Sequence, residues 1–187
     1  MKTQSTFKQI FTLTLTLLLI TAGVAAALAG INMITAPEIE IINQKKTTNA
    51  ISAVLGEADA ATAVETYTAT DKNDPVQTVY TSDAGYAVKV QTPGFGATIV
   101  MMVGVAKDGT VLGIDIISHA ETAGLGDVAA SKSAKGEAFR GQFVGKSGPL
   151  AVNKDDGKIE AIASATITSR AVTAGVNTAL EFVKTLG

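Results

Sequence analysis

Residues 98–117 read TIVMMVGVAKDGTVLGIDII, and this segment determines the predicted architecture. Two strand-like runs flank the dipeptide Asp108-Gly109: Thr98–Ala106, rich in β-branched residues and Met, and Val111–Ile117. An Asp-Gly turn between two such runs is typical of a β-hairpin. Upstream, Tyr86–Gln91 alternates Tyr and Val with Ala, Lys and Gln, and Pro93-Gly94 marks a turn. The sequence therefore predicts an antiparallel meander of three strands.

Helices are predicted after this meander. Ser169–Leu186 carries one apolar stripe at helical spacing and is the clearest helix outside the N-terminal region. A short helix is expected from Asp127 to Arg140, with Asp127 as its N-cap. Between these helices, Leu150–Val152 and Ile159–Ile162 are expected to pair across an Asp-Gly turn. The predicted fold class is therefore α+β, an antiparallel sheet with helices packed on it.

The N-terminal region has the properties of a membrane anchor. Positions 9–37 hold no charged residue, and the 25-residue run Ile10–Ile34 exceeds, as a helix, the roughly 30 Å hydrocarbon core of a bilayer. A cleaved signal peptide is the alternative, because Ala27-Leu28-Ala29 is an acceptable cleavage site. The apolar run continues past that site and is longer than a signal core of about 7–15 residues, which favours an uncleaved single-pass anchor.

The charges beside this run predict its orientation. Lys2 and Lys8 precede it, whereas Glu38 and Glu40 follow it. The positive-inside rule therefore places the N-terminus in the cytoplasm and the main domain outside the cell membrane. We expect a cytoplasmic tip and transmembrane anchor over 1–37, a juxtamembrane helix (to Gly56) and irregular segment (Ala58–Pro75) over 38–75, and the main domain over 76–187.

Composition excludes several function classes. The net charge of −2 provides no basic face, so nucleic-acid binding is not expected. The chain has no Cys, which excludes disulfides, thiol nucleophiles and Cys-ligated Fe–S clusters, and its single His argues against a conventional zinc site. Redox chemistry in such a chain requires a bound cofactor.

Two segments carry the candidate functional residues. In the first, the hydroxyl residues Ser164, Thr166, Thr168 and Ser169 cluster at the start of the predicted last helix, where unpaired N–H groups suit a phosphate. The alternative interpretation is that Thr168 or Ser169 is an ordinary N-cap and the others are turn residues.

The second segment, residues 118–127, follows the third predicted strand. It contains the only His and an acid, a hydroxyl and a Gly-x-Gly, namely His119, Glu121, Thr122, Gly124, Leu125 and Gly126. Glycines allow a backbone to approach a flat ligand closely. The alternative here is a plain strand-to-helix loop with a solvated Glu121 and a partly buried His119.

Together these segments resemble a known family. The sequences HAETAGLG (119–126) and IASATITSRAV (162–172) are similar to the FMN-binding domain of the G subunit of the Rnf electron-transport complex, which is related to the C subunit of the sodium-pumping NADH:quinone reductase. In that family, Asp-x-x-Ser/Thr-Gly-Ala-Thr is the signal for a flavin transferase, which attaches FMN through its phosphate to the final Thr. The resemblance implies attachment at Thr166, beside Ser164, Ala165 and Thr168. The chain has Glu160, Ala163 and Ser164 where the family signal has Asp, Ser or Thr, and Gly.

The resemblance also implies a function. It implies a membrane-anchored flavoprotein that would relay electrons through covalent FMN within an ion-translocating ferredoxin:NAD oxidoreductase, as an electron-transfer subunit rather than a stand-alone enzyme. Its partners would be the other membrane subunits and the flavin transferase, and the residues 119–126 would form a wall of the flavin site. The alternative function is an exported, non-redox binding or structural module, pilin-like in its N-terminal helix. A hydrolase using Ser, His and Glu is disfavoured, because no nucleophile elbow is present.

Overall fold

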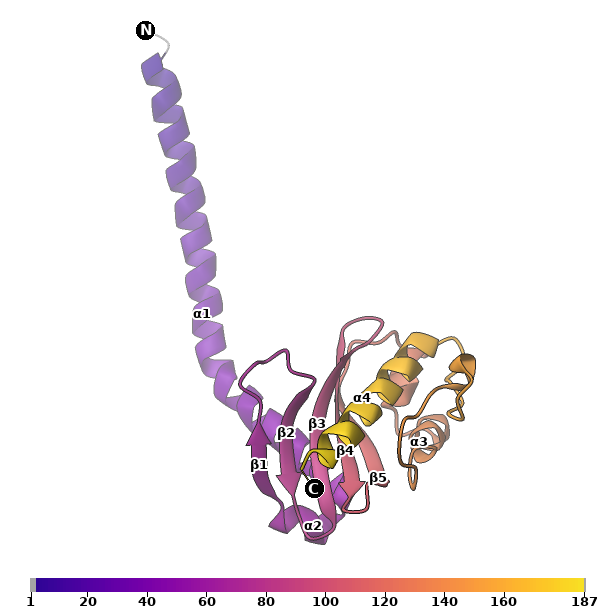
Figure 1. Cartoon of the computed structure of the whole chain (residues 1–187). Helices are drawn as coiled ribbons and strands as arrows, with labels where there is room; N and C mark the ends of the chain where they lie inside the picture. The colour runs from indigo at the N-terminus through magenta and orange to yellow at the C-terminus, as the bar shows by residue number, and fades with distance from the viewer. Residues whose placement is uncertain (1–2, 187) are drawn as a thin grey trace. The chain divides into compact units, whose positions relative to one another are not determined.

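The computed structural model describes residues 3–186, which divide between Lys45 and Lys46 into two compact units. The first unit is the N-terminal part of α1, one α-helix from Thr3 to Leu55 (Figure 1). Its side chains from Phe7 to Lys45 are exposed, although many are apolar. Among the described residues, this is the one helix long and apolar enough to cross a membrane.

Threonines in α1 satisfy their own hydroxyl groups. Thr12, Thr16 and Thr21 each donate to a helix carbonyl one turn back, at 2.8–2.9 Å. Such bonds remove the cost of placing a hydroxyl in an apolar medium. The polar residues in the predicted anchor are therefore compatible with a membrane segment.

The second unit is built on a five-stranded antiparallel sheet with the order β1-β2-β3-β4-β5. The strands are β1 (Val64–Thr68), β2 (Val76–Thr81), β3 (Gly85–Pro93), β4 (Thr98–Ala106) and β5 (Val111–Ser118). The predicted α+β class and the three-stranded meander are confirmed, since β3, β4 and β5 pair in sequence order. The prediction of an irregular segment from Ala58 to Pro75 is wrong, because this segment contains α2 (Glu57–Thr62) and β1. Strand β1 is an edge strand with mostly exposed side chains, so it has no apolar alternation that a sequence pattern reveals.

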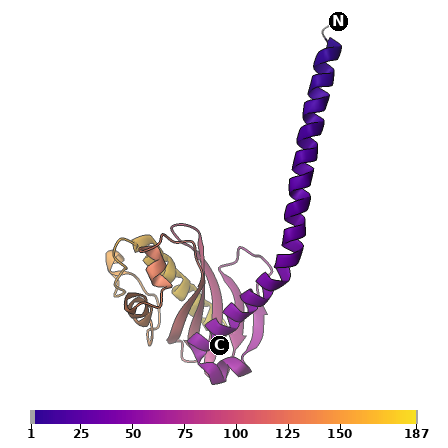
Figure 2. The same cartoon turned by 180° about the vertical axis from the view of Figure 1, so that it is seen from behind.

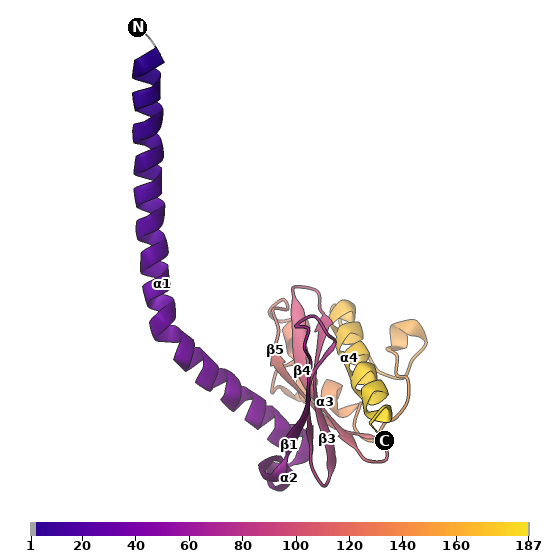
Figure 3. The same cartoon turned by 60° about the vertical axis from the view of Figure 1, so that its left-hand side comes forward.

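Helices cover both faces of this sheet. Helix α4 (Thr166–Lys184) lies on one face (Figures 1 and 3), where Val172, Val176 and Leu180 pack in the main core with strand residues. The last turns of α1 cross the opposite face (Figure 2), with Ile51 and Val54 in a second core cluster. The helix approaches the sheet closely there, since a Cβ at Gly104 would lie 2.6 Å from the Val54 carbonyl oxygen.

The segment between β5 and α4 differs in detail from the prediction. In place of one helix from Asp127 to Arg140 there are a 3₁₀ turn η1 (Gly126–Ala129) and the helix α3 (Ala134–Gly141). The N-cap of α3 is Ser133, whose Oγ accepts a hydrogen bond from the Gly136 N–H at 3.3 Å. A second 3₁₀ turn, η2 (Asn153–Asp155), follows Val152, which forms a single parallel bridge with Ile159 in place of the expected hairpin.

Candidate functional site

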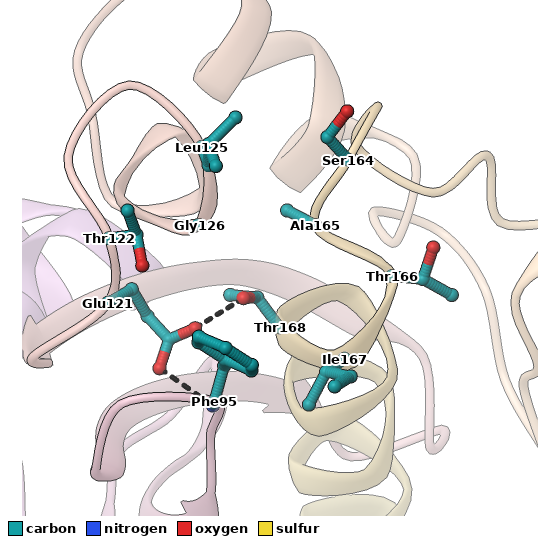
Figure 4. Close-up of a pocket in the computed structure, with 10 residues that line it drawn as sticks. All are labelled: Phe95, Glu121, Thr122, Leu125, Gly126, Ser164, Ala165, Thr166, Ile167 and Thr168. Atoms are coloured by element: carbon teal, nitrogen blue, oxygen red, sulfur yellow. Dashed lines mark hydrogen bonds between the residues drawn. The ribbon is translucent and has the colours of Figure 1, made fainter.

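Three segments that are distant in sequence form one pocket of about 340 Å³ (Figure 4). They are the β3–β4 connection, the loop after β5, and the start of α4 with the residues before it. The lining residues are Phe95, Glu121, Thr122, Leu125, Gly126, Ser164, Ala165, Thr166, Ile167 and Thr168. The two segments singled out in the sequence are thus brought together at one site.

Glu121 joins the three segments. Its side chain is buried, and Oε1 accepts hydrogen bonds from the Phe95 N–H at 2.9 Å and the Gly96 N–H at 3.1 Å. The other carboxylate oxygen accepts a hydrogen bond from the Thr168 hydroxyl in α4. Glu121 therefore is not the solvated loop residue of the alternative interpretation; it ties both neighbouring segments to its own loop.

Gly126 makes this arrangement possible. A Cβ at this position would lie 2.6 Å from the Thr168 hydroxyl oxygen and 2.8 Å from a Glu121 carboxylate oxygen. Any larger side chain would push the two partners apart, because real Cβ contacts are not this short. The second glycine of the Gly-x-Gly thus allows the loop to close against α4.

The start of α4 presents open backbone donors. Thr166 is the first helical residue, and the N-cap Ala165 has no side-chain capping bond. The first N–H groups of a helix have no intrahelical acceptors, and they carry the positive end of the helix dipole. Thr166 is half-buried at this helix end, and its side chain points away from the centre of the pocket (Figure 4).

The other hydroxyl residues of the first helical turn have structural partners. Thr168 is buried and donates to Glu121. The Ser169 hydroxyl donates to the Ala165 carbonyl at 3.0 Å and accepts from the Ile162 N–H at 2.9 Å. The interpretation of Thr168 or Ser169 as N-cap is therefore wrong, because tertiary partners and the preceding chain occupy both hydroxyls. In this turn, Thr166 is the residue whose hydroxyl lies at the open helix end.

Side chains from three elements hold the residues that precede Thr166, which we call the strap (Glu160–Ala165). The Glu160 N–H donates to the Gln142 side chain at 2.7 Å, and the Ala161 N–H donates to the Asn153 side chain at 3.3 Å. The Ile162 N–H donates to the Ser169 hydroxyl. Ser164 adopts a left-handed backbone with φ of 61°. That conformation favours glycine, which the resembling family has at this position.

Apolar side chains surround the pocket mouth. Phe95, Leu125 and Ile167 are 65%, 41% and 50% exposed, although each is large and apolar. Sequence reasoning missed Phe95 and Ile167. Phe95 lies in the turn between two strands, and its glycine neighbours are the only local sign of a close packing site. Exposed apolar groups beside open N–H donors suit a ligand with a flat apolar ring and a phosphate, so the residues present fit FMN.

Two predicted site residues lie beside the pocket rather than in its lining. His119 is half-buried, and its Nδ1 accepts a hydrogen bond from the Glu121 N–H at 3.3 Å, so it shapes the loop. Gly124, with φ of 75°, lines a neighbouring hollow of about 520 Å³ formed with α3 and the strap. The described residues contain no group of three or more His, Cys, Asp or Glu placed to hold a metal ion.

Comparisons with known proteins agree with this site. Residues 94–181 match the FMN-binding domain family. The G subunit of the Na(+)-translocating ferredoxin:NAD(+) oxidoreductase complex of Acetobacterium woodii is 35% identical over 206 residues, covering 99% of this chain and 97% of that protein. The G subunit of the proton-translocating ferredoxin:NAD(+) oxidoreductase complex of Clostridium ljungdahlii is 43% identical over 104 residues, 54% of each chain. The G subunit of the ion-translocating oxidoreductase complex of Methanosarcina acetivorans is 28% identical over 186 residues, covering 94% of this chain and 95% of that protein.

The matched region contains all three segments of the pocket, from the β3–β4 connection to the first turn of α4. The relative from Acetobacterium woodii aligns across nearly the full length of both chains, including the apolar N-terminal helix. The chain therefore belongs to the family of G subunits of ion-translocating ferredoxin:NAD oxidoreductase (Rnf) complexes, and it carries that family's FMN-binding domain.

Proposed function

We propose that this chain relays electrons through FMN held covalently, as a phosphoester, on Thr166. The observation that carries this proposal is the position of the Thr166 hydroxyl at the uncapped first residue of α4, beside the pocket closed by Glu121. A phosphoester keeps a negative charge, which the helix end stabilises by roughly 0.3–1 kcal/mol when exposed. Bound FMN supplies the capacity to accept and donate electrons, which the side chains of this Cys-free chain lack.

The pocket residues then have defined tasks. Phe95, Leu125 and Ile167 offer apolar surface to the flavin ring, while Thr122 and Ser164 offer hydroxyl groups at the same mouth. Glu121 and Thr168 hold the walls together through their hydrogen bond. Gly126 keeps its loop thin enough for those partners to meet.

Attachment requires an activated FMN donor and a flavin transferase. The Thr166 Oγ–phosphorus bond forms and the phosphoanhydride bond of the donor breaks, so the other half of the anhydride leaves with its bridging oxygen as a free phosphate, and the hydroxyl proton is released. The product is a phosphodiester at the N-terminus of α4, and the open N–H groups there stabilise its negative charge.

We also propose that α1 anchors the chain in the cell membrane with the N-terminus in the cytoplasm and the FMN domain outside. The flanking charges and the length of the apolar helix support this orientation. Electrons cannot cross about 30 Å of hydrocarbon in one step, so a neighbouring membrane protein of the complex must hold an intermediate carrier.

Covalent attachment is tested with the full chain purified after expression with a flavin transferase. We expect a denatured gel band that fluoresces under ultraviolet light, and an intact mass increased by FMN less one water. Thr166→Ala should lose both signals, whereas Thr166→Ser should keep them because the hydroxyl remains. Thr178→Ala, which removes another hydroxyl of α4, is the matched control and should remain flavinylated.

The outcomes separate the two function classes. Fluorescence that persists in Thr166→Ala would identify a different acceptor. A wild-type chain that never acquires flavin in the presence of the transferase would support the exported binding or structural module instead. Protease added outside intact cells (or spheroplasts) should remove the flavin band, and full protection until lysis would contradict the proposed orientation.

A further inference from the structure

Arg170 and Asp155 form a two-pronged ion pair beside the first turn of α4. The Arg170 Nε–H donates to Asp155 Oδ2 at 2.7 Å, and Nη2 donates to Oδ1 at 2.6 Å. This fork geometry fixes the plane of the guanidinium group. The Nη1 group takes no part in either of these bonds, so the pair leaves a donor edge open.

Arg170 lies one helical turn after Thr166. Residues at i and i+4 share a helix face, with Cβ atoms about 5–6 Å apart. Thr168 is buried on the opposite side of the helix, where it bonds to Glu121, and Ser169 is buried on the adjacent flank, where it bonds to the strap. The Thr166 side chain points away from the pocket centre (Figure 4), so it starts on the face that Arg170 occupies.

Stability alone does not account for this pair. The Arg170 and Asp155 side chains are 50% and 43% exposed, and exposed ion pairs contribute little to folding. Their geometry is nevertheless specific, because η2 places Asp155 beside α4, although Asp155 and Arg170 are 15 residues apart in sequence. A fixed guanidinium near an attachment hydroxyl matches the chemistry of a phosphate, which Arg binds through parallel N–H donors.

We propose that Arg170 binds the free oxygens of the phosphodiester that links FMN to Thr166, and that Asp155 positions the Arg170 guanidinium for this contact. This inference rests on the proposed attachment at Thr166. The guanidinium then lies between two anions, the carboxylate on one side and the phosphodiester on the other. Its positive charge, together with the helix end, offsets the repulsion between them.

The test uses the full flavinylated chain in detergent micelles and ³¹P NMR of the phosphodiester. We compare wild type with Arg170→Ala, Arg170→Gln, Arg170→Lys and Asp155→Asn, and use Lys184→Ala as a control for charge lost at the other end of α4. Denatured wild type gives the resonance position of the same ester without protein contacts.

We expect the resonance of Arg170→Ala and Arg170→Gln to move toward the denatured position, while Arg170→Lys recovers part of the native shift. Asp155→Asn should shift the signal less, since the guanidinium remains, and Lys184→Ala should leave it unchanged. The rate of flavin attachment should fall roughly two- to fivefold in Arg170→Ala, the range of an exposed charge contact.

The outcomes distinguish failure of this contact from failure of the attachment. If wild type and both uncharged Arg170 variants share one resonance position, at matched salt and with equal circular dichroism, the proposed phosphate contact is wrong although Thr166 is the acceptor. If wild type carries no covalent flavin, the proposed attachment itself is wrong, and this inference is wrong with it. A slower attachment rate with an unchanged resonance would assign Arg170 to transferase recognition and would also overturn the proposed contact.

Discussion

Replacing Glu121 by Gln tests whether one buried carboxylate holds the flavin pocket together. In the folded chain, three donors reach this side chain: the N–H groups of Phe95 and Gly96 and the Thr168 hydroxyl. Gln retains one acceptor oxygen for the two N–H groups, and the Thr168 hydroxyl can rotate to accept from the new amide. The loss is then the ionic character of the bonds, about 1–2 kcal/mol of unfolding free energy.

Glu121→Ala removes the acceptors altogether. Each donor left unpaired in a buried place costs about 1–3 kcal/mol, and solvent entering the space at the pocket recovers part of that cost. We therefore expect a loss of about 3 kcal/mol. Thr168→Val removes one donor and should cost about 1–2 kcal/mol. Because Glu121 and Thr168 are direct partners, the double variant Glu121→Gln/Thr168→Val should lose less than the sum, by about 0.5 kcal/mol or more.

The chain provides a selective probe for this measurement. All three of its Tyr residues, Tyr67, Tyr80 and Tyr86, lie in β1, β2 and β3. Tyrosine fluorescence during urea unfolding of the full chain in detergent thus reports on the sheet and not on the N-terminal helix. Variants that each cost less than about 0.5 kcal/mol, and whose effects add, would refute the role of Glu121 as the link between the walls.

Three further outcomes are expected. Ser164→Gly removes the backbone strain of a φ of 61°, about 1 kcal/mol, but glycine costs a similar amount of chain entropy, so the free energy of unfolding should stay unchanged. Flavin fluorescence per protein should be kept or improved. Ser164→Ala keeps the strain and is the control. Thr92→Val removes a buried hydroxyl that has no partner among the described residues and should raise the free energy of unfolding by about 1 kcal/mol in the urea assay; a loss would indicate a bridging water. The Arg170 hydrogen bond lowers the pKa of Asp155 below its ordinary value of 3.8, so the contribution of this pair to stability is present above 3.8 and is lost as pH falls through the lower folded pKa. Asp155→Asn should flatten the decline of the urea midpoint in that acid range, and an unchanged decline would contradict this assignment.

The sequence predicted those parts of the fold that local patterns determine. Strands β3, β4 and β5 follow from β-branched runs and an Asp-Gly turn, and the apolar stripe predicted α4 to within three residues at its start and two at its end. Strand β1 could not be predicted in this way, because an edge strand with exposed side chains is defined by its pairing with β2 and not by its own alternation.

In the site, too, the parts set by local sequence could be predicted and the parts set by tertiary contacts could not. The glycine-rich loop and the hydroxyl cluster are visible as segments, but their meeting at Glu121 is a tertiary fact that no local spacing encodes. The same tertiary bond explains the error over the N-cap, since Thr168 turns inward to Glu121 and cannot cap its own helix. The third wall, Phe95 and its neighbours, is recognisable in the sequence only as a turn because its contacts are with residues more than 20 positions away.

The hydrogen bonds of Glu121 span 25 and 26 residues on one side and 47 residues on the other. Closing such loops costs chain entropy before any bond forms, so the pocket consolidates after the hairpin of β4 and β5, whose partners are neighbours in sequence. Regions that form last through a few polar links are also among the first to open locally. A flavin seated there would therefore slow amide hydrogen exchange at Phe95, Gly96 and the loop after β5, where local opening breaks its contacts. Amides of the β3–β4 ladder would slow only to the extent that they exchange through global unfolding.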